Sequence, residues 1–263
     1  MLNSQLRSIA KRLIPERYRG AAASARDRIA GYRVESYSQQ GEDIILRILF
    51  DGVQAGFYVD VGAFHPARYS NTHLFYKRGW RGINIDATPG VVNAFNKYRP
   101  RDVNLEVAIA VSDKEMRLFM FKEGGLNTLS PELAEVQSAR LGRNVTSSKV
   151  VRTHALREIL DKYKSPGQEI HLLSVDVEGY DLEVLQSNNW KKYVPKVIVC
   201  EDLTLKNMED LAESAVYSFL RGEGYVLYAK CLHSLIFAHA SFQASDRNWS
   251  IKWRKQSPES SAL

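Results

Sequence analysis

The sequence is poor in cysteine and has neither a long apolar segment nor a glycine-rich phosphate-binding loop. Its two cysteines cannot build a disulfide framework or a metal motif, and Cys200, at the end of an apolar run, is expected to be a buried free thiol. Such cysteine usage suits a reducing compartment. No apolar run reaches about 18 residues, so no transmembrane helix is predicted.

The absent glycine loops narrow the kinds of cofactor that fit. The pattern G-x-G-x-x-G, which lets a backbone approach a pyrophosphate, does not occur, and neither does the GxxxxGK[ST] loop of ATP and GTP sites. An NAD-dependent oxidoreductase acting on sugars is therefore a disfavoured alternative.

An excess of positive charge is confined to the first 33 residues. The chain has 36 basic and 30 acidic residues, of which residues 1–33 contain eight basic and two acidic ones, so the remainder is neutral overall. A neutral core disfavours a nucleic-acid substrate. Residues 1–33 are predicted to form a basic helical arm, either a solvated extension or a peripheral contact with an anionic membrane. Because the arm lacks an apolar stretch of about 7–15 residues, a cytoplasmic location is expected, with any membrane contact at the inner face.

Two apolar runs that end in acidic residues indicate two strands of a nucleotide-binding unit. Residues 56–66 read GFYVDVGAFHP and residues 80–87 read WRGINIDA, and a short helix fits between them at residues 72–78. A strand, a glycine-bearing turn, a helix and a second strand form the opening unit of a doubly wound α/β nucleotide site. Asp86, at the tip of the second strand, is expected to bind the ribose hydroxyls; a surface turn is the alternative.

The first of these acids, Asp60, indicates which cofactor to expect. A carboxylate at the end of the first strand would repel a phosphate, whereas it suits the sulfonium and amino groups of S-adenosylmethionine. Gly62 would let the backbone approach that ligand, because any Cβ would intrude. A capping role for Asp60 and a plain tight turn at Gly62 are the alternatives. The pattern favours methyl transfer.

The rest of the chain predicts an α/β fold, a Rossmann-like seven-stranded methyltransferase sheet with flanking helices and a terminal antiparallel hairpin. The expected methyltransferase domain covers residues 34–246, and residues 247–263 form a polar tail. The segment 142–149 is polar and is predicted to be a mobile loop. Further strands are expected at 104–110, 116–122, 170–177 and 196–200, helices at 89–98, 132–141, 153–163, 181–187 and 209–221, and the hairpin at 225–231 and 234–239.

Six short segments, in this order, carry a family resemblance: YSQQGED (37–43), YVDVGAFHP (58–66), SNT (70–72), GWRG (79–82) with Asp86, AIAVSD (108–113) and LSVDVEG (173–179). Over about residues 37–240 the chain resembles the FkbM family of S-adenosylmethionine-dependent methyltransferases. The resemblance implies a Rossmann-like fold, S-adenosylmethionine as donor, and O-methylation, often of sugar hydroxyls in glycans, lipo-oligosaccharides or natural products. The chain departs from many members at residues 64–66, where they carry a further small residue.

Asp176 and Glu178, the two acids of the VDVEG segment, are the candidate catalytic residues. Period two along a strand would place Asp176 and Glu178 on one face, and buried carboxylates need a positive or protic partner. The donor sulfonium, a sugar hydroxyl or a divalent cation would serve; a salt-bridged structural pair is the alternative. Either acid, with His65 next, is expected to remove the hydroxyl proton, although His65 also suits a structural role. With Glu201 the two acids could ligate Mg²⁺, although no spacing requires a metal.

Other residues are candidates for binding the cofactor, and each of them also has a structural alternative. Gln39, Gly41 and Glu42 are either a lid or the start of a helix. Asn71 either anchors the cofactor carboxylate or caps a loop, and Ser112 with Asp113 either reaches the adenine or forms a turn. The predicted cofactor-binding residues are Gln39, Gly41, Glu42, Asp60, Gly62, Asn71, Asp86, Ala87, Ser112, Asp113 and Asp176.

The sequence therefore predicts an S-adenosylmethionine-dependent O-methyltransferase whose acceptor is a hydroxyl-bearing small molecule or glycan. Acceptor specificity is expected from residues 124–130 and 138–148, neither of which contains a decodable motif. The alternative is a catalytically weak cofactor-binding scaffold at a membrane or in a complex, with the basic arm as its functional part. The oligomeric state is not indicated.

Overall fold

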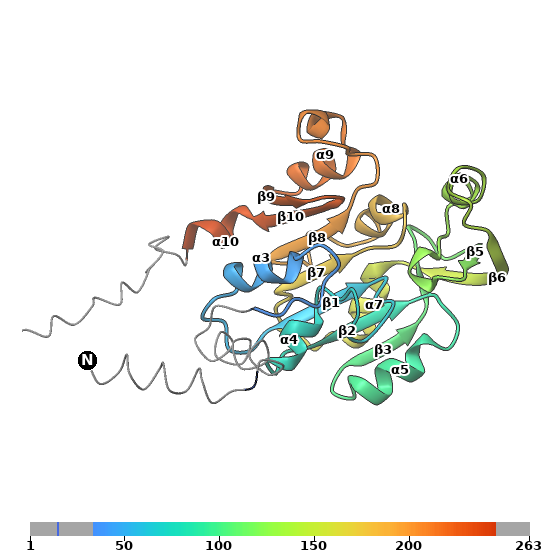
Figure 1. The fold of residues 1–263 in the computed structure, drawn as a ribbon. Helices are drawn as coiled ribbons and strands as arrows, with labels where there is room; N and C mark the ends of the chain where they lie inside the picture. Colours follow the sequence, from blue (N-terminus) through green and yellow to red (C-terminus); the bar gives the residue numbers. More distant parts are fainter. Residues whose placement is uncertain (1–14, 16–33, 246–263) are drawn as a thin grey trace, which may run out of the picture.

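The computed structural model describes Pro15 and residues 34–245, so the predicted arm, Pro15 apart, and the predicted tail lie outside the described residues. A seven-stranded sheet in the order β3-β2-β1-β7-β8-β10-β9 runs through the molecule (Figure 1). All neighbours from β3 to β8 are parallel, and β10 is antiparallel to both β8 and β9. The bounds are β1 Phe57–Val61, β2 Arg81–Asp86, β3 Val103–Glu106, β7 Leu172–Val175, β8 Val197–Glu201, β9 Tyr225–Cys231 and β10 Ser234–His239. The predicted Rossmann-like fold and terminal hairpin are confirmed.

Helices pack on both faces of this sheet because side chains alternate along its strands. In β1, Val59 and Val61 belong to the core cluster shared with α7, α8 and α9, whereas Tyr58 belongs to the cluster shared with α3 and α4. Asp60 therefore faces the α3 and α4 side. The helices are α3 Glu42–Leu49, α4 His73–Lys77, α5 Val91–Tyr98, α7 Leu156–Tyr163, α8 Asp181–Gln186, α9 Ala215–Gly222 and α10 Ala240–Ser245.

The order of the strands creates a switch point beside β1. The chain moves outward from β1 through β2 to β3 and then returns to β7 on the other side of β1, where Val61 pairs with Val175. In doubly wound sheets, ligands bind in the crevice outside the carboxyl ends of the strands at such a point. The VDVGAFHP and LSVDVEG segments thus meet at the position where this fold class places its ligand.

A second, three-stranded sheet corrects two predictions. It has the order β4-β6-β5, with β4 Ala108–Ile109, β5 Glu115–Phe121 and β6 Val145–His154, and it carries η1 Gly124–Leu126 and α6 Pro131–Leu141. The strand expected at 104–110 is split between the two sheets. The segment 142–149, expected to be mobile, contains a strand that was not predicted, since β6 pairs with β5 from Val145 onward. Its side chains are mostly exposed, so its composition is that of a loop although its backbone is paired.

Two predicted helices also have different bounds. The helix expected at 153–163 begins at Leu156, because Thr153 is buried in β6 and donates its hydroxyl to the Ser112 carbonyl at 2.7 Å. The helix expected at 209–221 is broken into η2 Glu209–Glu213 and α9. Ser214 starts the second part, since its hydroxyl accepts the Tyr217 N–H at 2.9 Å.

Two further predictions concern the cysteines and the absence of membrane-spanning helices. Cys200 is buried and free, as predicted, and Cys231 is also free. Within residues 34–245, none of the helices has the length and apolar character needed to span a bilayer.

Candidate active site

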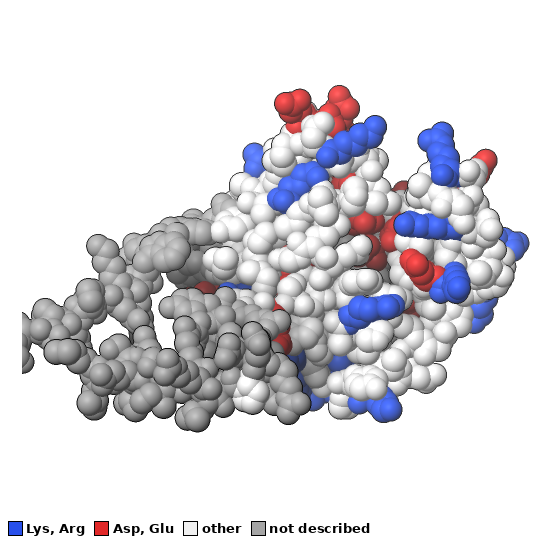
Figure 2. Space-filling model, in the orientation of Figure 1, with Lys and Arg blue, Asp and Glu red and all other residues white. Residues whose placement is uncertain are grey.

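A pocket that is open to solvent lies at the carboxyl ends of β1, β2 and β7, between the main sheet and the small sheet. Among the described residues, three carboxylates line it, those of Asp86, Asp176 and Glu178, and no lysine, arginine or histidine does. Figure 2 shows acidic side chains in the hollow between the surfaces that carry α9 and α6, with basic side chains around it. The described lining of the pocket is therefore acidic in composition.

Asp86 ends β2 and connects the loops on either side of the pocket. Its Oδ2 accepts the Phe64 N–H at 2.8 Å and its Oδ1 accepts the Thr88 N–H at 2.7 Å. Burial raises the pKa of this carboxyl, and the backbone donors act in the opposite direction. A carboxylate oxygen accepts more than one hydrogen bond, so both oxygens retain capacity for a ligand hydroxyl.

Gly62 joins the ends of two strands. Its φ is +81°, and a Cβ built on it would lie 1.7 Å from the carbonyl oxygen of Asp176. The Asp176 N–H in turn donates to the Val61 carbonyl at 3.0 Å. Gly62 lines the pocket, but the close approach that requires glycine is to the protein backbone at the end of β7 and not to a ligand.

Asp60 does not line the pocket and is instead part of a buried polar network. The Thr72 hydroxyl donates to Asp60 Oδ2 at 2.6 Å, and the same hydroxyl accepts Nη1 of the fully buried Arg99 at 2.7 Å. Burial raises the pKa of Asp60, while Arg99 and the hydroxyl donors oppose this. Arg99 also donates to the Pro66 carbonyl at 2.7 Å, to Ser70 Oγ at 2.8 Å and to Asn84 Oδ1 at 3.1 Å.

The other predicted residues before α4 also lie away from the pocket. Asn71 donates to Ser174 Oγ at 3.2 Å, next to the Asp60 network. Gln39 is exposed, and Gly41, with φ +87°, immediately precedes α3. Glu42 is buried and accepts the Ser234 hydroxyl at 2.7 Å. This arrangement agrees with the helix-start alternative.

Three further predicted residues have local partners outside the pocket. Ser112 and Asp113 are exposed, and Asp113 forms a two-bond ion pair with Arg152, at 2.6 Å for each bond. His65 is exposed, and its Nδ1 accepts the N–H groups of Ala67 and Arg68 at 3.0 and 2.9 Å. In place of Ser112 and Asp113, the β4 residues Ala108 and Ile109 line the pocket.

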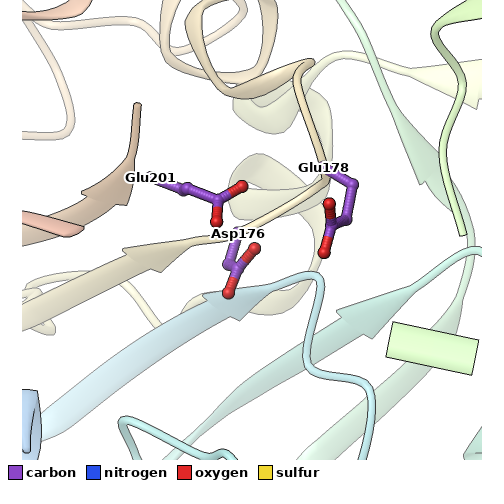
Figure 3. Close-up of side chains that lie close together, drawn as sticks. All are labelled: Asp176, Glu178 and Glu201. Atoms are coloured by element: carbon purple, nitrogen blue, oxygen red, sulfur yellow. The ribbon is translucent and has the colours of Figure 1, made fainter. Parts of the chain in front are cut away.

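Asp176, Glu178 and Glu201 converge beside the pocket (Figure 3). One oxygen of each carboxylate lies within 4.8 Å of one oxygen of the other two. Strand alternation is not the reason, because β7 ends at Val175 and Glu178 lies in the following turn with φ +52°. This left-handed conformation is uncommon for a residue with a side chain. The Thr128 hydroxyl donates to the Glu178 carbonyl at 2.7 Å and supports the turn.

Burial of these carboxylates disfavours their charged forms. It raises the pKa of Asp176 to about 7, with further contributions from the charges of Glu42, Asp60 and Asp86. Burial and then Asp176 raise the pKa of Glu178 to about 8 and that of Glu201 to about 10. Among the described residues, no lysine or arginine forms an ion pair with any of the three. The charge of Arg143 acts in the opposite direction and lowers the pKa of Glu178, although it forms no ion pair with this carboxylate.

A family model described as the methyltransferase FkbM domain matches residues 60–227, which is more than half of the chain. The chain belongs to the FkbM methyltransferase family. The matched span runs from β1 into β9 and contains every residue that lines the pocket. No curated protein and no solved structure matches the chain at a significant level. The sequence resemblance is confirmed, and the protein is a methyltransferase.

In this FkbM methyltransferase the sequence anticipated part of the pocket. Of the predicted site residues, Gly62, Asp86, Ala87, Asp176 and Glu178 line it. The other predicted site residues lie near β1, α3 or the small sheet, outside the pocket lining. The residues that could hold a cofactor are therefore found on three strand ends that the apolar runs of the sequence identified.

The opposite wall of the pocket in this methyltransferase comes from residues 124–130, which were predicted to set acceptor specificity but whose contacts the sequence did not indicate. Asn127 donates to Thr88 Oγ1 at 2.9 Å and so ties the loop after β5 to the end of β2. A Cβ built on Gly124 or Gly125 would contact the Phe64 ring at 3.4 or 3.5 Å, so the glycine pair lies against this ring. The glycine pair was a signal for a loop, but nothing local indicated its partner.

Proposed function

We propose that this FkbM methyltransferase uses S-adenosylmethionine as donor and methylates a hydroxyl group of a sugar-like acceptor. The observation that carries the proposal is the acidic lining of the pocket, to which residues 34–245 contribute three carboxylates and no cationic side chain. Such a lining favours a donor with a sulfonium and an amino group and disfavours a phosphate-bearing nucleotide.

The residues present fit this donor. Asp86, at the end of β2, suits the ribose hydroxyls, and the apolar side chains of Val107, Ile109 and Leu118 provide a wall for the adenine ring. When bound, S-adenosylmethionine supplies a methyl group activated by the sulfonium. The chain then has to align the acceptor oxygen with that methyl group and exclude water.

Removal of the hydroxyl proton falls to the acids after β7. Asp176 and Glu178 line the pocket, and burial raises their pKa values to about 7 and about 8. A general base is most effective when its pKa lies near the working pH, and it typically contributes about 10²–10⁴-fold. Either carboxylate is therefore suited to accept the proton. His65 is a weaker candidate, because its Nδ1 already accepts two backbone N–H groups outside the pocket.

The acceptor would enter along the small sheet. Gly124, Gly125, Asn127 and Leu129 form the pocket wall opposite the strand ends, within the loop that was predicted to set specificity. Phe64 lies against the glycine pair and offers an apolar surface there. The choice of a sugar hydroxyl rests on the family resemblance and on the proton-accepting pair. Peripheral membrane contact through residues 1–33 stays a prediction.

Calorimetry with S-adenosylmethionine, S-adenosylhomocysteine and NAD tests the donor. We expect heat with the first two and none with NAD. Asp86→Ala should abolish donor binding, whereas Glu178→Gln should retain it and slow turnover by about 10²–10⁴-fold.

Asp113→Asn is the matched control for the donor measurement, because this acid is exposed and paired with Arg152 outside the pocket. It should bind the donor as the wild type does. Uptake of NAD without heat from S-adenosylmethionine would contradict the proposal, and full activity of Glu178→Gln would exclude that residue as the base.

A further inference from the structure

The acidic cluster formed by Asp176, Glu178 and Glu201 is larger than a proton acceptor requires. Figure 3 shows the three side chains pointing toward one another from the turn after β7 and from the last residue of β8. One oxygen from each lies within 4.8 Å of the others. Neighbouring parallel strands thus present three carboxylates to one small volume at the ligand edge of the sheet.

The donor atoms and their spacing indicate a class of ligand. The cluster offers carboxylate oxygens and no histidine or cysteine, which suits Mg²⁺, Mn²⁺ or Ca²⁺ better than zinc. These ions hold oxygens at about 2.0–2.6 Å, so two ligands on opposite sides of one ion lie about 4–5 Å apart. The three oxygens all lie within 4.8 Å of one another, so their spacing is compatible with one shared ion.

A fourth carboxylate provides independent support. Asp181, the first residue of α8, is only 4% exposed, and its Oδ1 has no hydrogen-bond partner among the described residues. Its carboxylate faces the backbone of Val177 and of Glu201, so it lies between the two strand ends that carry the cluster. Glu201 Oε2 is likewise buried without a partner. Buried acceptors of this kind call for a bound cation or for protons.

We propose that Asp176, Glu178 and Glu201 bind one divalent cation of the Mg²⁺ and Mn²⁺ class, with the buried Asp181 as a further carboxyl group nearby. The cation borders the pocket, because Asp176 and Glu178 line it. Three protein oxygens leave about three positions of an octahedral ion for water or for acceptor oxygens. Provided that the proposed function holds, the ion would bind the acceptor hydroxyl and lower its pKa, and the proton would pass to the carboxylate oxygen of Asp176 or Glu178 that does not ligate the ion.

The test is a Mn²⁺ titration of the full-length chain, freed of metal with EDTA, at near-neutral pH and without donor. Electron paramagnetic resonance of free Mn²⁺ should show one ion bound per chain, and Mg²⁺ should displace it. Glu201→Gln keeps the side-chain shape but removes a ligand charge, and should weaken binding by about tenfold or more. Glu115→Gln, at an exposed position of β5, is the matched control and should bind as the wild type does.

Thermal melting confirms that the variants are folded and gives a second readout. Mn²⁺ should raise the Tm of the wild type and of Glu115→Gln, and at the same Mn²⁺ concentration it should raise the Tm of Glu201→Gln less. A wild type that binds no Mn²⁺, or Glu201→Gln with unchanged affinity, would overturn the proposal. Release of bound Mn²⁺ by S-adenosylmethionine would also overturn it, because the carboxylates would then serve the donor.

Failure of this proposal can be told apart from failure of the proposed function. Cation binding is measured without methyl transfer and can succeed in a protein that binds no donor. Calorimetry of donor binding in EDTA reports on the donor alone. A chain that binds the donor but no Mn²⁺ therefore loses only the metal site.

Discussion

Arg99 carries a positive charge into the interior beside β1. Its guanidinium is fully buried and donates to four oxygens that are all neutral, from Pro66, Ser70, Thr72 and Asn84. It reaches Asp60 through the Thr72 hydroxyl. One side chain therefore holds the loop after β1, the start of α4 and the middle of β2 together.

Replacement of this arginine should be costly for stability. Arg99→Met leaves the Asp60 carboxylate without its cation and several buried oxygens without donors, and we expect a loss of about 3–5 kcal/mol in the free energy of unfolding. Urea unfolding measures it. Arg117→Met, at an exposed site bonded to Ser148, is the control and should stay within about 0.5 kcal/mol of the wild type. Equal losses in both variants would show that the buried network does not stabilise the fold.

Among the elements, the contact between the carboxyl ends of β1 and β7 constrains the site most. The two strands run in register, and the chain leaves β1 through Gly62 against the backbone of Asp176. This contact places the Asp86 loop and the VDVEG turn on the same pocket. Neither strand alone specifies it.

A pair of glycine substitutions isolates this contact. Gly62 and Gly142 both have positive φ, +81° and +65°, so an alanine at either position is strained by about 1–2 kcal/mol. Only Gly62→Ala would also place a Cβ 1.7 Å from the Asp176 carbonyl oxygen, whereas nothing lies within 4 Å of the Cβ at Gly142. We expect Gly62→Ala to lose about 1–3 kcal/mol more than Gly142→Ala in urea unfolding. The same loss in both would mean that the strand ends separate readily.

For the molecule as a whole, buried titratable groups change the stability of the fold with pH, and they do so in opposite directions. Buried carboxylates such as Asp60 and Asp86 have raised pKa values, so their contribution to stability is present at low pH and is lost as the pH rises. His73 acts in the other direction. Burial, and then the charges of Arg99 and Lys77, lower its pKa to about 4, and its Nδ1 is buried without a hydrogen-bond partner among the described residues.

A histidine substitution should therefore change the pH profile of stability. The folded protein disfavours the charged form of His73, so its contribution is complete above the usual pKa of about 6.5 and is lost as the pH falls toward about 4. Because the ring is half-buried, solvent screening reduces the effect to about 1 kcal/mol. The difference in unfolding free energy between the wild type and His73→Phe, measured by urea unfolding from near pH 7 to near pH 5, should shift by this amount in favour of the variant. A difference that does not change with pH for His73→Phe would contradict the assignment.

Local pattern was sufficient to predict the strand ends and several residues of the pocket. Apolar runs that end in Asp86 and in VDVEG mark where strands stop, and parallel strands present these ends at one edge of a sheet. The same reasoning failed for residues 142–149, because solvent-facing side chains gave no sign that β5 would pair with their backbone. It also placed Asp60 in the pocket, whereas strand alternation turns it toward Thr72 and Arg99.

Residues close in sequence thus determine the sheet and the sign of the charge at its ligand edge, since periodicity and end residues are properties of short segments. Which acids face one another depended on contacts between distant segments. Glu201 meets Asp176 and Glu178 only because β8 pairs with β7, and Asp113 is withdrawn from the pocket by Arg152 on β6. Such pairings depend on packing across the whole chain, which no short stretch of sequence encodes.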